Sequence, residues 1–166
     1  MFDKVTVERV EKYLDRYGWK RHKGIDEPNE QEGVVLTGWR SPQGESHLLT
    51  IDPIIEKNVL VFKAGGVLKA PPNNTPADCL NGLLMALSGL NYMMILGKWC
   101  FDPRDGEVRF TLAIPIDEGR LAYSEFEHCL NVVVATVSTT ASKLKEVVEG
   151  KKSAMELLAE EGLNIA

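Results

Sequence analysis

The spacing of apolar residues changes along the chain between a helical period and a period of two, and these changes divide it into elements. Apolar positions three and four residues apart predict a first helix from about Val5 to Tyr17, which Gly18 ends. The same spacing predicts a second helix with Thr75 as its N-cap, Pro76 at its first helical position and an end at Gly97.

Two further helices are predicted in the last third of the chain. Ser124 and Glu127 have the spacing of a capping box, and the apolar stripe that follows them continues to about Glu149. Ser153 and Glu156 repeat that spacing and predict the start of a short last helix.

Alternation of apolar and polar residues predicts five strands. They cover residues 34–39, 47–55, 58–64, 98–102 and 107–116, and residues 65–74 are predicted as a loop. Asp105-Gly106, between the last two strands, is typical of a β-hairpin turn. The apolar residues at positions 108, 110, 112, 114 and 116 share one face, which predicts a sheet that is buried on one side.

These elements predict an α+β fold in a single domain over residues 1–166. Its five-stranded antiparallel sheet is flanked by helices in the order α-βββ-α-ββ-α-α, because short connections join the first three strands and the last two. The helix from about residue 153 is an additional short element whose role the pattern leaves open. A chain of 166 residues is long enough to bury one core.

The charge balance disfavours nucleic acid as a partner. The chain has 19 Lys and Arg against 24 Asp and Glu residues, a formal net charge of −5, whereas binding a polyanion requires basic side chains that replace its counterions. The one basic cluster is Arg16, Lys20, Arg21 and Lys23, and it lies beside the acidic residues Asp26, Glu27, Glu30 and Glu32. We interpret these residues as a solvated surface patch rather than a phosphate site.

Cysteine usage and the N-terminal pattern predict a cytoplasmic protein. Cys79, Cys100 and Cys129 form no CxxC pair and lie in apolar stretches, as free cysteines in a reducing compartment do. The first helix alternates charged and apolar residues, unlike a signal peptide. The uncharged stretch between Asp78 and Lys98 contains polar residues and glycines, which favours a buried helix over a membrane span. We therefore expect no membrane partner.

No spacing in the chain predicts a catalytic, metal or cofactor site. His22, His47 and His128 form no HExxH-type pair, so no helix would present two imidazoles to one metal. The turn of residues 102–107 carries Arg104 where a calcium loop needs an oxygen ligand, which favours the hairpin. The sequence therefore predicts a protein without cofactors that is not an enzyme.

One alternative keeps a small-ligand or catalytic function open. Such a site would assemble from scattered residues, and a pocket that gathers His47, Asp52 or Cys100 with shifted pKa values would favour it. The polar residues Asn81 and Asn91 in the second helix are interpreted instead as caps of a loop or strand end.

The second predicted helix is apolar on more than one side, which indicates self-association. Met85, Met93 and Leu96 widen its apolar arc beyond the single stripe that one neighbouring layer would cover. The rest of the arc is covered either by the long C-terminal helix or by a second copy in a two-fold dimer, and we favour the dimer. The predicted interface residues are Met85, Met93 and Met94, with Trp99 and Trp39 as aromatic anchors.

A series of short motifs runs from the second helix to the start of the long one. They are Leu90-Asn91, Gly97-Lys98-Trp99-Cys100-Phe101-Asp102, Asp105-Gly106-Glu107-Val108, Ala113-Ile114-Pro115-Ile116, Leu121 and Phe126. This series resembles the YbjN-like family, and the resemblance extends from the first helix to about Glu149. Members of that family are similar in fold to type III secretion chaperones, in which a twisted antiparallel sheet is flanked by helices and dimers form through the middle helix and a neighbouring strand.

The resemblance implies a function in protein binding. Secretion chaperones are small acidic dimers that hold an extended segment of another protein on the sheet and helix surface, and YbjN-like proteins are named as regulators of sensory or stress responses. The family offers no catalytic residue to carry over. We therefore expect a chaperone-like or regulatory homodimer whose partner is another protein.

Overall fold

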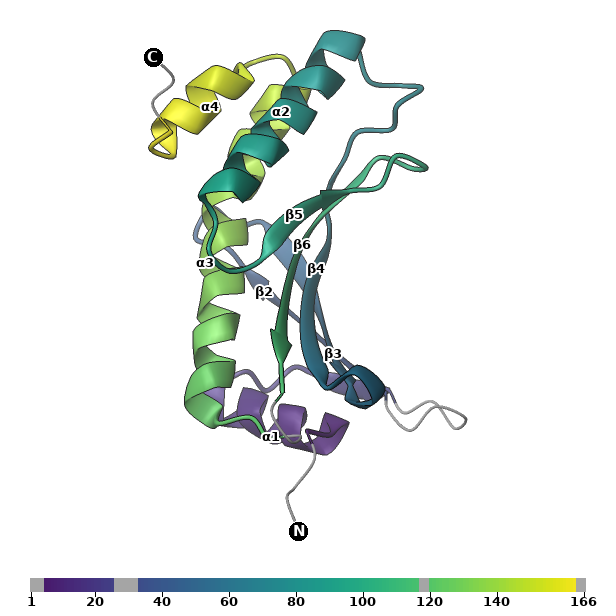
Figure 1. Ribbon diagram of the computed structural model, residues 1–166, viewed down its shortest axis with the longest axis vertical. Coiled ribbons are helices and arrows are strands. Elements are labelled where there is room, and N and C mark those ends of the chain that lie inside the picture. Colours follow the sequence, from purple (N-terminus) through teal and green to yellow (C-terminus); the bar gives the residue numbers. More distant parts are fainter. Residues whose placement is uncertain (1–4, 26–32, 117–119, 164–166) are drawn as a thin grey trace.

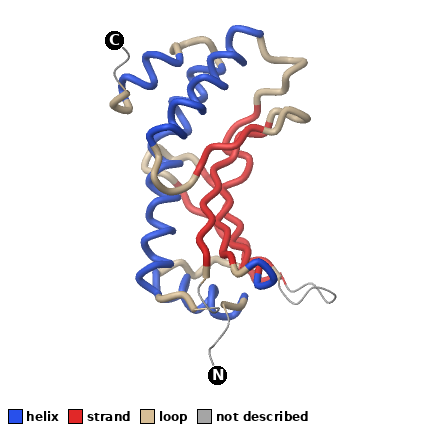
Figure 2. The backbone as a smooth tube through the Cα atoms, in the orientation of Figure 1, coloured by secondary structure: helices blue, strands red, loops and turns tan. Residues whose placement is uncertain are grey.

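The part of the chain that the computed structural model describes, residues 5–25, 33–116 and 120–163, forms one antiparallel sheet with helices on one side (Figure 1). The helices are α1 (Val7–Tyr17), α2 (Ala77–Met93), α3 (Tyr123–Val148) and α4 (Ala154–Glu160), with a short 3-10 turn η1 (Ile55–Lys57). The strands are β1 (Lys23–Ile25), β2 (Val34–Arg40), β3 (Ser46–Ile54), β4 (Val59–Lys69), β5 (Lys98–Phe101) and β6 (Glu107–Pro115). Figure 2 shows the two kinds of element as separate layers, which confirms the predicted α+β class.

The sheet has six strands, so the prediction of five is wrong. Their order is β1-β2-β3-β4-β6-β5, and every neighbouring pair is antiparallel. The unpredicted strand β1 has only three residues and lies in a basic stretch, where no alternating pattern is visible. Tertiary contacts hold it in place. The Gly24 N–H donates to Glu11 Oε1 at 3.0 Å, and Thr37 Oγ1 donates to the Arg21 carbonyl at 2.9 Å.

Strand β4 is longer than predicted because it continues through Gly65 and Gly66. Its pairing with β6 shifts in register between Ala64 and Leu68, which marks a β-bulge. Gly66 has a φ of 58°, a conformation that glycine adopts at low cost, and its N–H donates to Glu107 Oε1 at 2.9 Å. The Gly-Gly pair, predicted as the start of a loop, is therefore part of the sheet.

Three predicted helix starts are displaced by one or two residues, and α2 ends at Met93 rather than at Gly97. Helix α1 begins at Val7 and not at about Val5. Pro76, and not Thr75, is the N-cap of α2, and it makes no side-chain cap bond. Helix α3 begins after Ala122, whose N–H donates to Glu125 Oε2 at 2.8 Å. The capping box predicted from Ser124 to Glu127 is therefore wrong, because a glutamate closer to the start makes the same backbone bond.

Two other local motifs are confirmed. Ser153 and Glu156 form the predicted capping box of α4: the Ser153 N–H donates to Glu156 Oε2 at 2.7 Å, and the Glu156 N–H donates to Ser153 Oγ at 3.1 Å. The turn of residues 102–106 joins β5 and β6 as a hairpin, and the Gly106 N–H donates to the Asp102 carbonyl at 2.8 Å. Side-chain bonds from Arg104 lower the pKa of the Asp102 carboxyl to about 2.

Helix α3 is the longest element and contributes most of the helical part of the core. Its fully buried residues include Phe126, Leu130, Val133, Val137 and Leu144. Phe126 packs against Phe62 of β4 with ring centroids 5.6 Å apart. Helix α1 packs at one end of α3, where the Tyr13 hydroxyl donates to the Leu121 carbonyl at 2.6 Å. Helices α2 and α4 pack at its other end (Figure 1).

One face of the sheet packs on the helices, and the other is not covered by any described element. In β6, Val108, Phe110 and Leu112 are fully buried, whereas Arg109 and Ala113 are exposed, so the predicted shared face is confirmed. In β3, His47 and Leu49 are buried, whereas Leu48 is exposed. We call the uncovered side the open sheet face; it carries Leu36, Leu48, Lys63, Lys98 and Arg109.

Candidate protein-binding surface

Helix α2 is buried on one side and partly covered on a second. Its buried residues are Leu83, Ala86, Leu87 and Leu90. Helix α4 covers the second side so closely that a Cβ atom on Gly89 would lie 2.5 Å from Leu158 Cδ2. The sequence analysis expected either the long helix α3 or a second copy of the chain to cover this side of α2. In the structure the short last helix α4 covers part of it. Among the described helices, α2 included, none is both long and apolar enough to cross a bilayer.

The remaining side of α2, with the segment after it, exposes large apolar side chains. The exposed fraction is 54% for Met85, 84% for Tyr92 and 97% for Ile95. Met85 and Tyr92 are about two helical turns apart, so they lie on one side of the helix. Leu84 and Leu96 are also exposed. We call these five residues the α2 apolar band.

Hydrogen bonds at the end of α2 fix the direction of this band. Asn91 Nδ2 donates to the Trp99 carbonyl at 2.9 Å, and the Trp99 N–H donates to Asn91 Oδ1 at 2.7 Å. Asn91 thereby pairs with β5 as a strand residue would, which confirms its predicted role as the cap of a strand end. Gly97 has a φ of 82° and lies against the Phe110 ring, where a larger side chain would clash.

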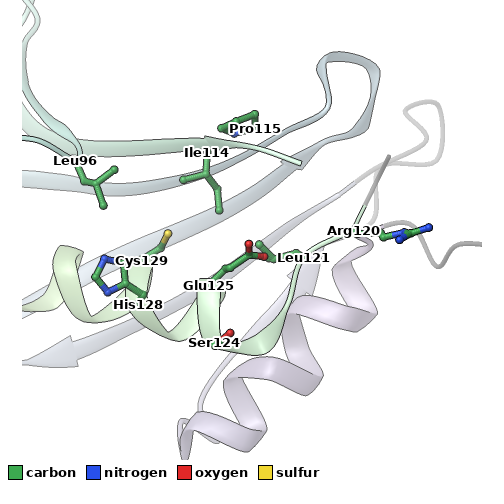
Figure 3. Close-up of a pocket in the computed structure, with 9 residues that line it drawn as sticks. All are labelled: Leu96, Ile114, Pro115, Arg120, Leu121, Ser124, Glu125, His128 and Cys129. Atoms are coloured by element: carbon green, nitrogen blue, oxygen red, sulfur yellow. The ribbon is translucent and has the colours of Figure 1, made fainter. Parts of the chain in front are cut away.

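A pocket of about 430 Å³ lies between β6 and the first turns of α3 (Figure 3). Leu96 of the α2 apolar band lines it, so the pocket and the band form one continuous surface. The other lining residues are Ile114, Pro115, Arg120, Leu121, Ser124, Glu125, His128 and Cys129. Strand β5 pairs only with Val108–Thr111, so the last residues of β6 have no described strand beside them at this edge.

One titratable group of the pocket, the Cys129 thiol, has a shifted pKa. Burial raises the pKa of the Cys129 thiol, and the nearby Glu125 carboxylate adds to the shift. The thiol therefore stays protonated at neutral pH and is a weak nucleophile. Within the described ranges, no group of three or more His, Cys, Asp or Glu side chains could hold a metal ion.

The structure separates the five predicted interface residues. Met85 lies in the α2 apolar band, whereas Met93 and Met94 are half-buried against the core at the end of α2. Trp99 is 3% exposed and packs edge-on against Phe110, so it is a core residue. The sequence analysis missed Tyr92, although it follows Met85 by seven residues, about two helical turns. It also missed Ile95, which lies after α2 ends at Met93.

Trp39 lies away from α2, in a cluster between β2, β3 and α3. Its Nε1 donates to Ser138 Oγ at 2.9 Å, and its ring stacks on Trp19 with centroids 6.1 Å apart. On its other side is His47, whose ring centroid is 5.0 Å away. Trp39 is half-buried by these contacts and does not extend the α2 apolar band.

The residues of the alternative catalytic site do not meet. His47 is buried on the helical side of the sheet, and its burial lowers the pKa of the imidazole. Asp52 lies on the open sheet face, where its carboxylate is 3.7 Å from Lys63 Nζ. Cys100, opposite Arg109 in the β5–β6 register, also lies on the open sheet face.

The predicted surface patch is described only in its basic half. The Arg16 guanidinium lies 3.9 Å over the Tyr123 ring, and Lys20 Nζ donates to the Asp15 carbonyl at 2.8 Å. The acidic half, Asp26, Glu27, Glu30 and Glu32, lies outside the described residues.

Residues 6–146 match the sequence model of one protein family, YbjN, described as "Putative bacterial sensory transduction regulator". The chain belongs to the YbjN family. The match includes all the strands, α1, α2 and nearly all of α3, whereas α4 of this YbjN-family protein follows the matched region. A search of curated proteins gave no match.

Solved structures share the fold of this YbjN-family protein at low sequence identity. YbjN from E. coli, titled a putative transcription regulator, is 15% identical with a TM-score of 0.58, covering 88% of this chain and 94% of that one. A chain of the solved ExsC–ExsE complex is 15% identical with a TM-score of 0.55, covering 86% and 97%. An uncharacterized protein from Methanothermobacter thermautotrophicus is 14% identical with a TM-score of 0.56, covering 89% and 99%.

Proposed function

We propose that this YbjN-family protein is a non-catalytic protein-binding module, chaperone-like or regulatory, that works as a cytoplasmic homodimer. The observation that carries the proposal is the α2 apolar band, in which Tyr92 and Ile95 are almost fully exposed. Monomeric soluble proteins rarely expose contiguous apolar patches of large side chains unless the patch is an interaction site.

The band is suited to a rigid interface. Asn91 and Gly97 fix the backbone on either side of Ile95, so little conformational freedom is lost when the band is covered. Tyr92 and Met85 belong to the residue types that are enriched at interfaces. A two-fold dimer would use this one patch twice, and each copy would cover the other.

The binding of a second protein has support from the fold. A chain of similar fold was solved as part of the ExsC–ExsE complex. For this chain, the pocket that adjoins the α2 apolar band offers a recess for an apolar side chain of a partner. The net charge of −5 and the absence of a helix able to span a bilayer among the described residues give no support to nucleic acid or membrane as the partner.

The dimer is tested by light scattering across a dilution series. Wild type is expected to have twice the chain mass of 18.4 kDa at high concentration. Ile95→Asp places a charge in the centre of the band and is expected to yield a monomer with an unchanged circular dichroism spectrum, because Ile95 makes almost no contact within the chain.

A matched control is Leu48→Asp, which introduces the same charge at an exposed leucine on the open sheet face. This variant is expected to remain a dimer. A wild type that stays monomeric at every concentration, or a dimer that Ile95→Asp leaves intact, would contradict the homodimer through this band.

The pocket supports a second candidate function, the binding of a small apolar molecule. Its volume of about 430 Å³ is within the range of ligand sites, roughly 300–1,000 Å³. A thermal-shift screen with small amphipathic molecules tests this function. Stabilisation that Cys129→Phe abolishes would assign the pocket to a ligand, because the phenyl ring would fill it.

A further inference from the structure

All charged residues of the six strands lie on the open sheet face. The strand registers place on this side the basic residues Lys23, Arg40, Lys63, Lys69, Lys98 and Arg109, and the acidic residues Asp52 and Glu107. Six basic minus two acidic side chains give the strands a net charge of +4 on this face, whereas the whole chain has −5. The open sheet face is therefore a basic surface on an acidic protein.

One row of side chains crosses the whole sheet. The cross-strand partners are Lys23, Leu36, Thr50, Lys63, Thr111 and Lys98, in that order from β1 to β5. Three of the six are lysines, and none is acidic. The lysines are not direct neighbours: Lys23 and Lys63 are three strand spacings apart, and Lys63 and Lys98 are two, so the positive charges are spread across the width of the sheet.

The acidic groups near this face neutralise only part of its charge. Asp52 pairs with Lys63 at 3.7 Å, and Asp105 of the turn pairs with Lys69 at 3.1 Å. The four remaining basic residues, Lys23, Arg40, Lys98 and Arg109, form no ion pair with any described residue. Lys23 and Arg40 lie beside Leu36 and Leu48 on β1 and β2, whereas Lys98 and Arg109 lie on β5 and β6 toward the opposite edge of the sheet.

The same face exposes apolar side chains at its centre. Leu48 is 75% exposed and Leu36 is 40% exposed. Leu36 is opposite Thr50, and Leu48 is two residues before Thr50 in β3, so the two leucines are diagonal neighbours. The strand positions of the open sheet face carry no aromatic residue, because the tryptophan and phenylalanine residues of the strands point to the helical side.

We propose that the open sheet face binds an extended acidic segment of a partner protein, whose apolar side chains contact Leu36 and Leu48 while its carboxylates pair with the basic residues around them. This inference rests on the proposed function and names the surface and the chemistry of the partner. Charge complementarity selects the occupant. The occupant is not the open sheet face of a second copy, because the basic residues of the two faces would repel each other.

Single-stranded nucleic acid fits the same face less well. Sheets that bind it stack the bases on exposed aromatic side chains, which the open sheet face lacks. Its exposed leucines instead offer contacts for apolar side chains of a peptide.

The probe is a fluorescein-labelled peptide in which Glu-Ser-Leu-Ser is repeated three times. In an extended chain alternate residues point to one side, so Glu and Leu would face the sheet in turn. The matched peptide has Lys in place of each Glu, and oligothymidine is the nucleic-acid probe. Anisotropy titrations of wild type are expected to show binding of the acidic peptide alone, weakening as salt is raised.

Two substitutions locate the binding. Leu48→Asp is expected to weaken binding of the acidic peptide about tenfold or more, since it removes an apolar contact and adds a repelling charge. Lys98→Glu is expected to weaken it by several-fold, whereas Lys12→Glu, the same charge change at an exposed position of α1, is expected to leave it unchanged. Circular dichroism of each variant confirms that it is folded.

The outcomes separate this inference from the proposed function. Equal binding of the acidic and basic peptides, equal effects of Lys98→Glu and Lys12→Glu, or preference for oligothymidine would each overturn the basic docking face. A wild-type dimer that binds no acidic peptide would overturn this inference and leave the homodimer standing. A monomer that binds the acidic peptide through Leu48 would support this inference and overturn the homodimer.

Discussion

Asn91 connects α2 to the sheet through a single side chain. An asparagine in an apolar helix needs partners for its amide, and this need predicts a cap. The identity of the partner, Trp99, required the structure, because the chain turns at Gly97 before β5 begins. Tyr92 and Ile95 lie in the segment between these two bonded residues.

Replacing Asn91 with alanine is expected to lower the free energy of unfolding by about 2–3 kcal/mol. The change removes two hydrogen bonds and leaves the N–H and carbonyl of the buried Trp99 without them. Urea unfolding followed by circular dichroism measures the loss. Asn81→Ala, at an exposed position of the same helix, is the control and should change stability by less than about 0.5 kcal/mol. Equal effects of the two substitutions would rule out the capping role.

Buried His47 predicts a loss of stability in weak acid. Burial lowers its pKa below the ordinary value of 6.5, so below about that pH the unfolded chain binds more protons than the folded one. The stabilising contribution is therefore present above that pH and is lost as the pH falls through it. The urea midpoint of wild type should drop between neutral and weakly acidic pH, and that of His47→Gln should drop less. Parallel profiles for the two proteins would disprove this assignment.

At the scale of elements, the spacing of apolar residues predicted the elements that are determined by interactions between residues close in sequence. The four helices, the hairpin and the buried face of β6 follow from spacing and turn residues. Strand β1 does not, because its three residues are held by Glu11 and by pairing with β2, both distant in sequence. The bulge at Gly65-Gly66 was interpreted as a loop for the same reason. Of the candidate interface, Met85 was predicted, whereas Trp99 resembled an anchor but is buried.

Helix α4 covers α2 in this protein, although it follows the region that matches the family. Its contact with α2 is expected to stabilise the fold: Leu158→Ala should lower the free energy of unfolding by about 2–4 kcal/mol, because Leu158 is buried against Gly89. Met155→Ala, at a more exposed position of α4, should cost about 1 kcal/mol or less. Urea denaturation distinguishes the two, and similar values would mean that α4 contributes little through this contact.

At the scale of the whole molecule, the helices and the open sheet face divide the surface into chemically different sides. The α2 apolar band lies at the β5 edge, where α2 leads into the sheet (Figure 1). The strand registers place the basic residues of the open sheet face on the side without helices. A protein that self-associates through one surface and holds a partner on another needs the two surfaces to be separate. The net charge of −5 keeps the rest of the surface acidic, so the basic face is distinct from it.

This separation predicts that the two surfaces act independently. Leu48 is in β3, three strand spacings or roughly 14 Å from β5, beyond the distance at which substitutions usually couple. Ile95→Asp should therefore abolish the dimer while weakening affinity for the acidic peptide by no more than Lys98→Glu does, because Ile95 is three residues before Lys98. Leu48→Asp should leave the dimer intact and weaken that affinity about tenfold or more. In the double variant both losses should add. A large loss of peptide affinity in Ile95→Asp alone would instead mean that the peptide contacts both copies of the dimer, because only then would breaking the α2 interface remove part of its binding surface.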